Sequence, residues 1–257
     1  MMVAHDENVG RMLGKLDELG IADDTIVMYS TDNGPHYNSW PDAGITPFRS
    51  EKNTNWEGGW RVPAFVRWPG QITAGTVLNG MVTHQDWLAT LLAAAGVPDN
   101  KEKLLTGHKA GEKTYKVHID GFNLLPYLRA EVSESPREAF FYISDEGDIL
   151  AIRMKDWKMV LQEQRSTRMQ CWAESFVSLR VPKMFNLRRD PFERADENSN
   201  TYWDWLISHG YLLYAMQALV ANQIGEFKAF PPRQKRASFN LDAVLRQLQD
   251  SGGSQGH

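Results

Sequence analysis

The sequence predicts an α/β protein that carries a smaller antiparallel part at its carboxyl end. An amphipathic helix at residues 1–20 runs directly into a short apolar strand at 25–31, which is half of a β-α-β repeat and favours a parallel sheet. A second short strand at 62–68 precedes an apolar helix at about 86–95. After about residue 130 the chain forms short strands separated by tight turns, a pattern typical of an antiparallel meander.

The first helix is predicted from the spacing of its apolar residues. They recur every three or four positions on one face, and Gly20 follows them as a helix end. The members of this face are Val9, Met12, Leu13, Leu16 and Leu19. Residues 1–20 have neither a basic leader nor a continuous apolar segment, so they do not form a signal peptide. We expect a chain that enters its first domain partway, and a periplasmic or secreted location of the full-length protein stays open.

The second part is predicted to be a small antiparallel α+β domain at 131–257, after an α/β domain at 1–130. Its strands are expected at 139–144, 149–153 and 157–162, with a fourth at 183–187. Its helices are expected at 201–227 and 238–249, before a flexible tail.

Composition excludes several classes of partner. The chain has 257 residues, a net charge of −4 and a pI near 6.0, whereas nucleic-acid binding requires a basic face. No segment approaches the roughly 20 apolar residues of a membrane-spanning helix. Cys171 is the only cysteine, so there is no disulfide framework. We therefore expect a globular protein with neither a nucleic-acid partner nor a membrane partner.

Asp32 and Asn33 end the first predicted strand abruptly. Followed by Gly34, they have the composition of a tight hairpin turn, but residues 35–48 contain prolines and no alternation that would form a return strand. A carboxylate and an amide oxygen at the carboxyl end of a strand are typical ligands of Ca²⁺ or Mg²⁺. We expect both side chains to turn into a polar pocket at the end of a central parallel strand.

Lys52 is the second candidate residue. A lone lysine is ordinarily a solvated surface residue, but this one lies between the oxygen pair and Glu57-Gly58-Gly59, where glycines permit close backbone approach. A cation there can neutralise a tetrahedral anion or the charge of a leaving group. We expect its ammonium within several ångströms of the Asp32 carboxylate, with His36 as the histidine that lines the same site.

Other reactive or aromatic residues favour structural roles. His36, His84 and His118 match no zinc-binding pattern, and Cys171 is expected to be packed or half-exposed. A basic run at 233–236 is expected to be a solvated loop. A group of aromatic residues is expected to serve core and interface packing, and its members are Tyr202, Trp203, Trp205, Tyr211 and Tyr214.

Several segments together resemble the carboxyl-terminal half of a bacterial arylsulfatase. They are STDNG at 30–34, FRSEKNTNWEGGWRVPAFVRWPG at 48–70, THQDWLATLLAAAG at 83–96, KMFNLRRDPFERAD at 183–196 and FPPRQKRASFNLD at 230–242. The resemblance covers essentially the whole chain. It implies the alkaline-phosphatase-like α/β fold of the sulfatase family, with a small antiparallel carboxyl-terminal subdomain packed on it.

The resemblance also implies roles for individual residues. Asp32 and Asn33 match the third and fourth ligands of the family's divalent cation, usually Ca²⁺, and Lys52 matches the lysine that contacts the substrate sulfate. The nucleophile implied is a formylglycine hydrate made from a cysteine in a signature motif. Cys171 is followed by Trp-Ala-Glu and does not match that motif. The nucleophile and the remaining ligands are expected in an amino-terminal half that this sequence lacks.

Three functions stay open at this point. The first is a sulfuric ester hydrolase, of which this chain is a fragment with marginal stability and no activity alone. The second is a phosphonate or phosphodiester hydrolase of the same superfamily, because a metal and a lysine suit phosphoryl as well as sulfuryl groups. The third is a non-catalytic remnant that only binds or assembles.

Overall fold

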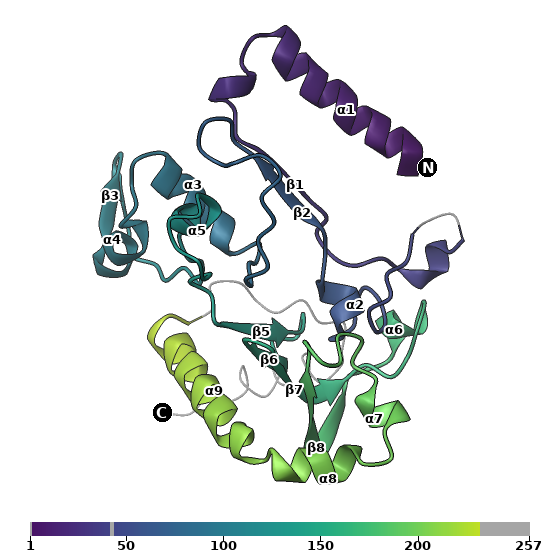
Figure 1. Cartoon of the computed structure of the whole chain (residues 1–257). Coiled ribbons are helices and arrows are strands. Elements are labelled where there is room, and N and C mark those ends of the chain that lie inside the picture. Colours follow the sequence, from purple (N-terminus) through teal and green to yellow (C-terminus); the bar gives the residue numbers. More distant parts are fainter. Residues whose placement is uncertain (1, 42–43, 232–257) are drawn as a thin grey trace, which may run out of the picture.

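The computed structural model describes residues 2–41 and 44–231, in which helices and antiparallel sheets alternate along the chain (Figure 1). The first half of the helices comprises α1 (Met2–Glu18), α2 (Glu57–Trp60), α3 (Asp86–Ala94), α4 (Asn100–Thr106) and α5 (Leu125–Leu128). The later helices are α6 (Gln170–Ala173), α7 (Ala195–Asn198), α8 (Tyr202–Ser208) and α9 (Tyr211–Ala229). Two 3-10 helices are η1 (Ala22–Asp24) and η2 (Tyr37–Ser39).

The strands of the described residues form three antiparallel sheets. Two of them are strand pairs, one of β1 (Val27–Ser30) with β2 (Ala64–Arg67) and one of β3 (His108–Ala110) with β4 (Lys113–Tyr115). The third is a four-stranded meander of β5 (Ala139–Ile143), β6 (Ile149–Met154), β7 (Trp157–Glu163) and β8 (Val177–Asn186), in that order. The meander predicted from the sequence is confirmed, including its fourth strand.

The pairing of β1 corrects one expectation. Within the described residues β1 is not a central parallel strand, because its hydrogen-bonded neighbour is β2, antiparallel, with Val27 opposite Arg67 and Ser30 opposite Ala64. A parallel pair needs a crossover that returns the chain to the starting edge of the sheet. Here β2 instead begins beside the end of β1, since Ser30 lies opposite Ala64. The described residues between the two strands, 31–41 and 44–63, contain no strand, so the rejection of a tight hairpin is confirmed.

Helix α1 matches the predicted helix, and Gly20 follows it with a φ of 68°, a conformation suited to glycine. It lies at one end of the molecule, away from the four-stranded sheet (Figure 1), and none of its residues is buried. Side chains connect it to the strand pair, since His5 hydrogen-bonds the Tyr29 hydroxyl at 3.0 Å and Arg67 lies 3.4 Å from Asp17. The apolar face of α1 is only partly covered, since Met12 and Leu19 are exposed and its other members are partly buried.

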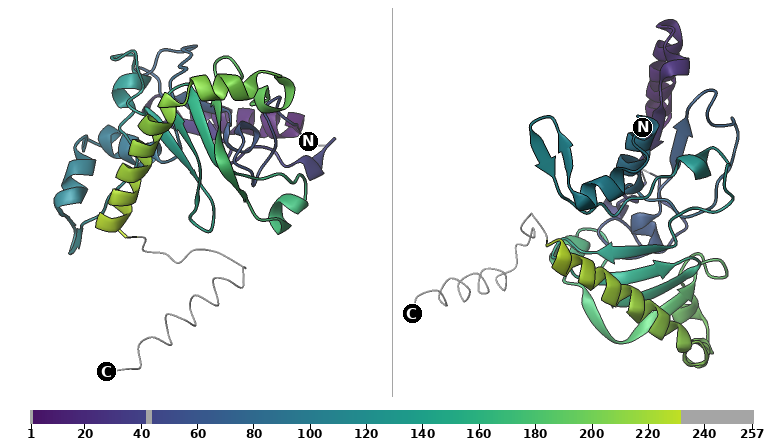
Figure 2. Two further views of the ribbon diagram at one scale, coloured as in Figure 1. Left: turned by 90° about the horizontal axis from the view of Figure 1, so that it is seen from below. Right: turned by 90° about the vertical axis from the view of Figure 1, so that its left-hand side faces the viewer.

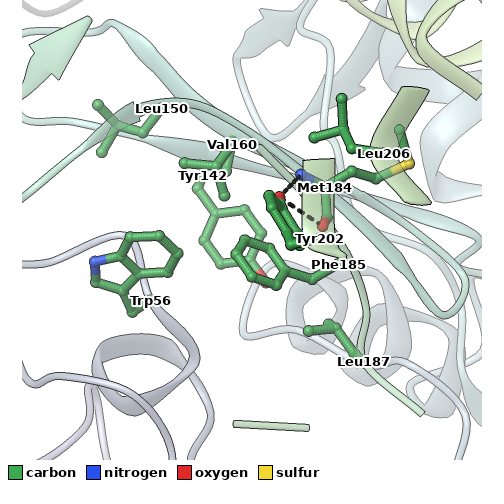
Figure 3. Packing of buried hydrophobic residues seen from close by; sticks show 10 residues of the cluster. Trp56, Tyr142, Leu150, Val160, Met184, Phe185, Leu187, Tyr202 and Leu206 are labelled. Carbon is green, nitrogen blue, oxygen red and sulfur yellow. Dashed lines mark hydrogen bonds between the residues drawn. The ribbon is translucent and has the colours of Figure 1, made fainter. Parts of the chain in front are cut away.

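One face of the four-stranded sheet packs against the segment that carries Lys52. Tyr142, Ala151 and Val160 are cross-strand neighbours on this face, and all three are buried. Trp56, which is 2% exposed, packs into the same cluster and meets Phe185 edge to face (Figure 3). Residues from the first part of the chain therefore complete the core of a sheet formed by the second.

The opposite face of the sheet is covered by α9, which runs along it in the views of Figure 2. Ile152 and Met159 are cross-strand neighbours here, and the buried Met216 of α9 packs on them. Tyr202 of α8 fixes the edge strand, because its hydroxyl donates to the Met184 carbonyl oxygen at 3.0 Å and accepts from the Met184 amide at 2.9 Å (Figure 3). The long aromatic helical region thus serves packing at some positions, although Trp203, Tyr211 and Tyr214 are exposed.

A buried ion pair ties α3 to the start of the sheet. The guanidinium of Arg137 contacts both carboxylate oxygens of Asp86 at 2.6 to 3.1 Å, and both side chains are almost fully buried. This pair and the packing of Trp56 both join residues before position 130 to residues after it. The division of the chain into domains at that point stays a prediction.

Some elements were not predicted, and some predictions lie outside the described residues. The sequence analysis gave no expectation for α4, β3, β4 and α5. The expected last helix at 238–249 and the basic run at 233–236 lie outside the described residues. None of the helices in the described part of the chain is long and apolar enough to cross a membrane.

Candidate functional site

The segment that follows β1 docks directly on the Lys52 and Gly58-Gly59 segments. The Gly34 amide donates to the Gly59 carbonyl oxygen, and the Lys52 amide donates to the Pro35 carbonyl oxygen, both at 2.9 Å. A Cβ atom on Gly34 would lie only 1.8 Å from the Gly58 carbonyl oxygen. The approach of the two backbones therefore requires glycine at position 34. We call this contact the junction.

Asp32 and Asn33 lie immediately before the junction. Asp32 is exposed and Asn33 is partly buried. The Thr31 hydroxyl lies 3.0 Å from the Asn33 carbonyl oxygen and 3.4 Å from the Asp32 carboxylate. The Asn33 side-chain nitrogen donates to the Gly34 carbonyl oxygen at 2.8 Å, and no described residue donates a hydrogen bond to its side-chain oxygen. Two hard oxygen donors are thus available to a divalent cation.

Lys52 is partly buried and lies between two residues in the left-handed backbone region. Ser50 and Asn53 have φ values of 61° and 65°, which shape a tight turn around the lysine. Its ammonium lies over the Trp172 ring, 5.8 Å from the ring centre. The junction brings the backbone of Lys52 to that of Pro35. The expected approach of its ammonium to the Asp32 carboxylate stays a prediction.

Glu51 connects three segments at this site. Its side chain is fully buried, and its two carboxylate oxygens accept hydrogen bonds from the Tyr37 amide at 2.6 Å and the Arg168 amide at 2.7 Å. The same carboxylate lies 3.8 Å from His36 Nε2. Burial, followed by the charge of Glu51, raises the pKa of Tyr37. The sequence analysis missed Glu51, because nothing in its neighbours distinguishes a buried glutamate from a solvated one.

His36 and Lys52 share one neighbour, Trp172, and the place of His36 in the candidate site stays a prediction. The Trp172 indole Nε1 donates to His36 Nε2 at 3.0 Å, and His36 Nδ1 hydrogen-bonds the Asn38 side-chain oxygen. Both ring nitrogens of this histidine therefore have a hydrogen-bond partner. Trp172 belongs to α6, more than a hundred residues away along the chain, so no local sequence pattern predicts this contact.

The Glu57 that begins the Glu-Gly-Gly turn has a structural role in a buried charge network. Lys158 Nζ lies 3.2 Å from Glu57 and 2.7 Å from Glu193, and the Tyr142 hydroxyl donates to Glu57 at 2.6 Å. Burial disfavours the Glu57 charge, but Lys158, Arg153 and the Tyr142 hydrogen bond outweigh it and lower the pKa of Glu57. For Glu193 burial prevails, and its pKa is raised.

Arg49 extends this network to the surface. Its guanidinium donates to the Glu193 carbonyl oxygen at 2.7 Å and to Asp196 and Glu197 at 2.9 Å each, while it lies 3.6 Å over the Trp56 ring. The motif at 48–70 and the motif at 183–196 therefore meet in space, through Arg49 with Glu193 and Asp196.

A separate acidic group contains His118, for which the sequence predicted no metal site. The candidate ligand atoms of His118, Asp120 and Glu226 lie within 4.8 Å of one another. His118 Nδ1 faces Asp120 at 3.3 Å, whereas Nε2 faces Glu226 at 3.8 Å. The three side chains could therefore hold a metal ion, although the two carboxylates lie at different nitrogens of the ring.

Cys171 is buried, as a packed residue was expected to be, and it is chemically quiet. Its thiol donates to the Ser166 carbonyl oxygen at 3.2 Å. Burial, with a contribution from the Glu51 charge, raises the pKa of Cys171 to about 11. A thiol in this state is a poor nucleophile near neutral pH.

Comparison with known proteins gives one consistent result. A model of the sulfatase family matches residues 1–97. The chain is 35% identical to the steryl-sulfatase of Mus musculus over 211 residues, covering 74% of this chain and 31% of that protein. It is 30% identical to the arylsulfatase A of Homo sapiens over 200 residues, covering 73% of this chain and 36% of that protein.

A solved sulfatase structure matches this chain as well. The PsFucS1 sulfatase from Pseudoalteromonas sp. matches with a TM-score of 0.72 and 29% sequence identity, over 91% of this chain and 43% of that one. This match confirms the fold class expected from the sequence. The chain spans about a third of the length of the curated relatives named above, at 31% and 36% of their lengths.

Proposed function

Because this chain belongs to the sulfatase family, we propose that it supplies part of the active site of an arylsulfatase-type sulfuric ester hydrolase. The observation that supports this proposal most is the junction. There the segment with two oxygen donors is hydrogen-bonded to the segment with Lys52, through Gly34 to Gly59 and Lys52 to Pro35. Sulfate-ester cleavage needs positive charge at the sulfuryl oxygens, and the junction joins the backbones of the two segments that carry the proposed sources of that charge.

Asp32 and Asn33 are proposed to hold a divalent cation, Ca²⁺ before Mg²⁺. The donor set fits, since a carboxylate and an amide oxygen are hard ligands and the Asn33 side-chain nitrogen is already engaged by Gly34. Ca²⁺ binds roughly six to eight oxygens, so these two residues fill only part of its shell. When bound, the cation supplies charge that stabilises the sulfuryl oxygens.

Lys52 is proposed to bind the sulfate directly. Its ammonium would donate to a sulfuryl oxygen and oppose the negative charge that develops as the ester bond breaks. His36 is proposed to line the same site, where its Nε2 is hydrogen-bonded to the Trp172 indole.

The nucleophile is proposed to be a formylglycine outside this chain. Cys171 does not fit that role, since its thiol is buried and its pKa is about 11. With the chain spanning about a third of its relatives, at 31% of the length of the mouse steryl-sulfatase, the remaining ligands and the nucleophile would come from the rest of the sulfatase fold. An amino-terminal half of that fold is therefore the proposed partner, and a sulfate ester is the proposed substrate.

The test is a reconstituted assay. The chain is purified alone and after co-expression with the amino-terminal half of a sulfatase relative, and 4-nitrophenyl sulfate and 4-nitrophenyl phosphate are offered with excess CaCl₂. We expect no turnover from the chain alone and sulfate-selective turnover from the pair. Lys52→Ala should lower kcat by about 100-fold or more without a matching loss of stability.

Lys109→Ala is the matched control, because Lys109 is an exposed lysine of β3 outside the site. Equal rates for Lys52→Ala and the parent would overturn the role of Lys52. A preference for the phosphate would favour the phosphodiesterase alternative, and a pair that folds without turning over either substrate would favour a non-catalytic remnant.

A further inference from the structure

Trp172 presents an exposed aromatic ring beside Lys52. The side chain belongs to the short helix α6, and the residue is 54% exposed. Its ring lies 5.8 Å from the Lys52 ammonium, and its indole nitrogen donates to His36 at 3.0 Å. The second part of the chain thus places a flat apolar surface next to the residue proposed to hold the sulfate.

The backbone that carries this ring is held in place by several contacts. The Asn53 side chain donates to the Cys171 carbonyl oxygen at 2.7 Å, and the Arg168 amide donates to the buried Glu51 carboxylate at 2.7 Å. The Gln164 side chain donates to the Glu174 carbonyl oxygen at 2.8 Å. The indole is therefore held in position by its bond to His36 and by the backbone around it, while 54% of the residue stays exposed and can receive a ligand.

We propose that Trp172 determines specificity by receiving the sugar ring of a sulfated saccharide whose sulfate is bound by Lys52. This proposal rests on the proposed function, since it assigns the substrate class of the same site. A pyranose ring has an apolar C–H face that packs on an indole, while its hydroxyl groups point to polar neighbours and water. Trp172 would act by binding and orientation, and no proton or bond is transferred to it.

The surroundings of Trp172 favour a sugar over a larger apolar group. Asn38 and Ser39 are exposed next to His36 in the chain, so polar groups are available to sugar hydroxyls. The exposed Met169 contacts Asn38 at 3.5 Å and adds one apolar side chain to this rim. A sterol-like group would need an enclosed apolar pocket that buries most of its surface. Trp172 does not line either of the two hollows found among the described residues, which lie at α8 with Tyr202 and at α3 with Thr90.

The experiment is an NMR titration of the 257-residue chain, with ¹⁵N-labelled tryptophan side chains. The sequence has nine tryptophans, and the indole signal that Trp172→Phe removes is assigned to Trp172. The probes are D-galactose 6-sulfate, D-galactose, sodium sulfate and 4-nitrophenyl sulfate. Affinities are compared for the parent, Trp172→Ala, Lys52→Ala and the control Trp203→Ala, whose residue is similarly exposed at 53%.

We expect D-galactose 6-sulfate to shift the Trp172 signal, D-galactose to shift it only at higher concentration, and sodium sulfate to leave it unmoved. Trp172→Ala should weaken binding of the sulfated sugar by about tenfold, the usual scale of an aromatic stacking contact, whereas Trp203→Ala should not weaken it. Lys52→Ala should remove the preference for the sulfated over the plain sugar.

Each failure has its own signature. Sulfated-sugar binding that depends on Lys52 but leaves the Trp172 signal and the Trp172→Ala affinity unchanged would overturn this inference and retain the proposed function. A Trp172 shift with no preference for sulfate and no effect of Lys52→Ala would retain the sugar surface and count against the proposed function. No shift with either sugar, or a stronger response to 4-nitrophenyl sulfate than to the sulfated sugar, would overturn the saccharide assignment.

Discussion

The four-stranded sheet and the segment from 31 to 60 obtain their order in different ways. Strands β5 to β8 pair in the order in which they occur, so each strand is stabilised by its neighbours along the chain. Among the described residues between 31 and 60 the regular elements are η2 and α2, and this segment is fixed by contacts with distant residues. Asn55 bonds both the Gln162 carbonyl oxygen at 2.7 Å and the Gln164 amide at 3.2 Å. The candidate chemistry therefore lies on a segment whose rigidity comes from the sheet.

The largest effect is expected from removing the cation that joins the two regions. Lys158→Met leaves the buried Glu57 and Glu193 carboxylates without their common partner. We expect the free energy of unfolding to fall by about 3–5 kcal/mol, as for other buried pairs broken from one side, measured by urea titration. Lys155→Met is the control, since its pair with Glu138 is 69% exposed on both sides. Equal stability of the two variants would show that the network does not support the segment.

A smaller effect is expected at the junction itself. In Gly34→Ala the new methyl group would meet the Gly58 carbonyl oxygen at 1.8 Å, so one backbone must move. We expect a loss of about 1–3 kcal/mol, the range of overpacked sites. Gly10→Ala in α1 meets nothing within 4 Å and should stabilise the helix by up to about 1 kcal/mol. Both variants are measured by thermal unfolding. If Gly34→Ala unfolds at the same temperature as the parent, the junction is looser than the structure shows.

The four-stranded sheet could be predicted from the sequence better than the segment from 31 to 60 could. The strands of the meander were predicted to within a few residues, apart from β8, which begins earlier than expected at Val177. The segment that follows Asp32 and Asn33 meets the segment of Lys52 at the junction, whereas the roles of these three side chains stay predictions. Glu51 and Trp172 were missed, because their roles depend on contacts with Arg168 and His36 at separations above a hundred residues. The pairing of β1 was wrong, since a helix followed by a strand does not fix which strand pairs with it.

The smallest effect is expected at Cys171, and it concerns pH. The pKa of this thiol is about 11 in the folded chain against an ordinary value of 9.0, so folding favours the protonated thiol. Its contribution to stability is therefore complete below pH 9 and is lost as the pH rises through 11. We expect a thiol reagent at pH 8 to label the folded chain slowly and the urea-unfolded chain rapidly. Fast labelling of the folded chain would contradict the burial of Cys171.

The central proposal, that Asp32 and Asn33 beside the junction hold the cation rather than the acidic group at His118, is tested most directly by calcium affinity. Isothermal titration of the chain co-expressed with the amino-terminal half of a sulfatase relative compares the parent with Asp32→Ala and Asp120→Ala. We predict that Asp32→Ala weakens Ca²⁺ binding on the order of 100-fold and that Asp120→Ala leaves it unchanged. Unchanged binding in Asp32→Ala, with a loss in Asp120→Ala, would contradict the account.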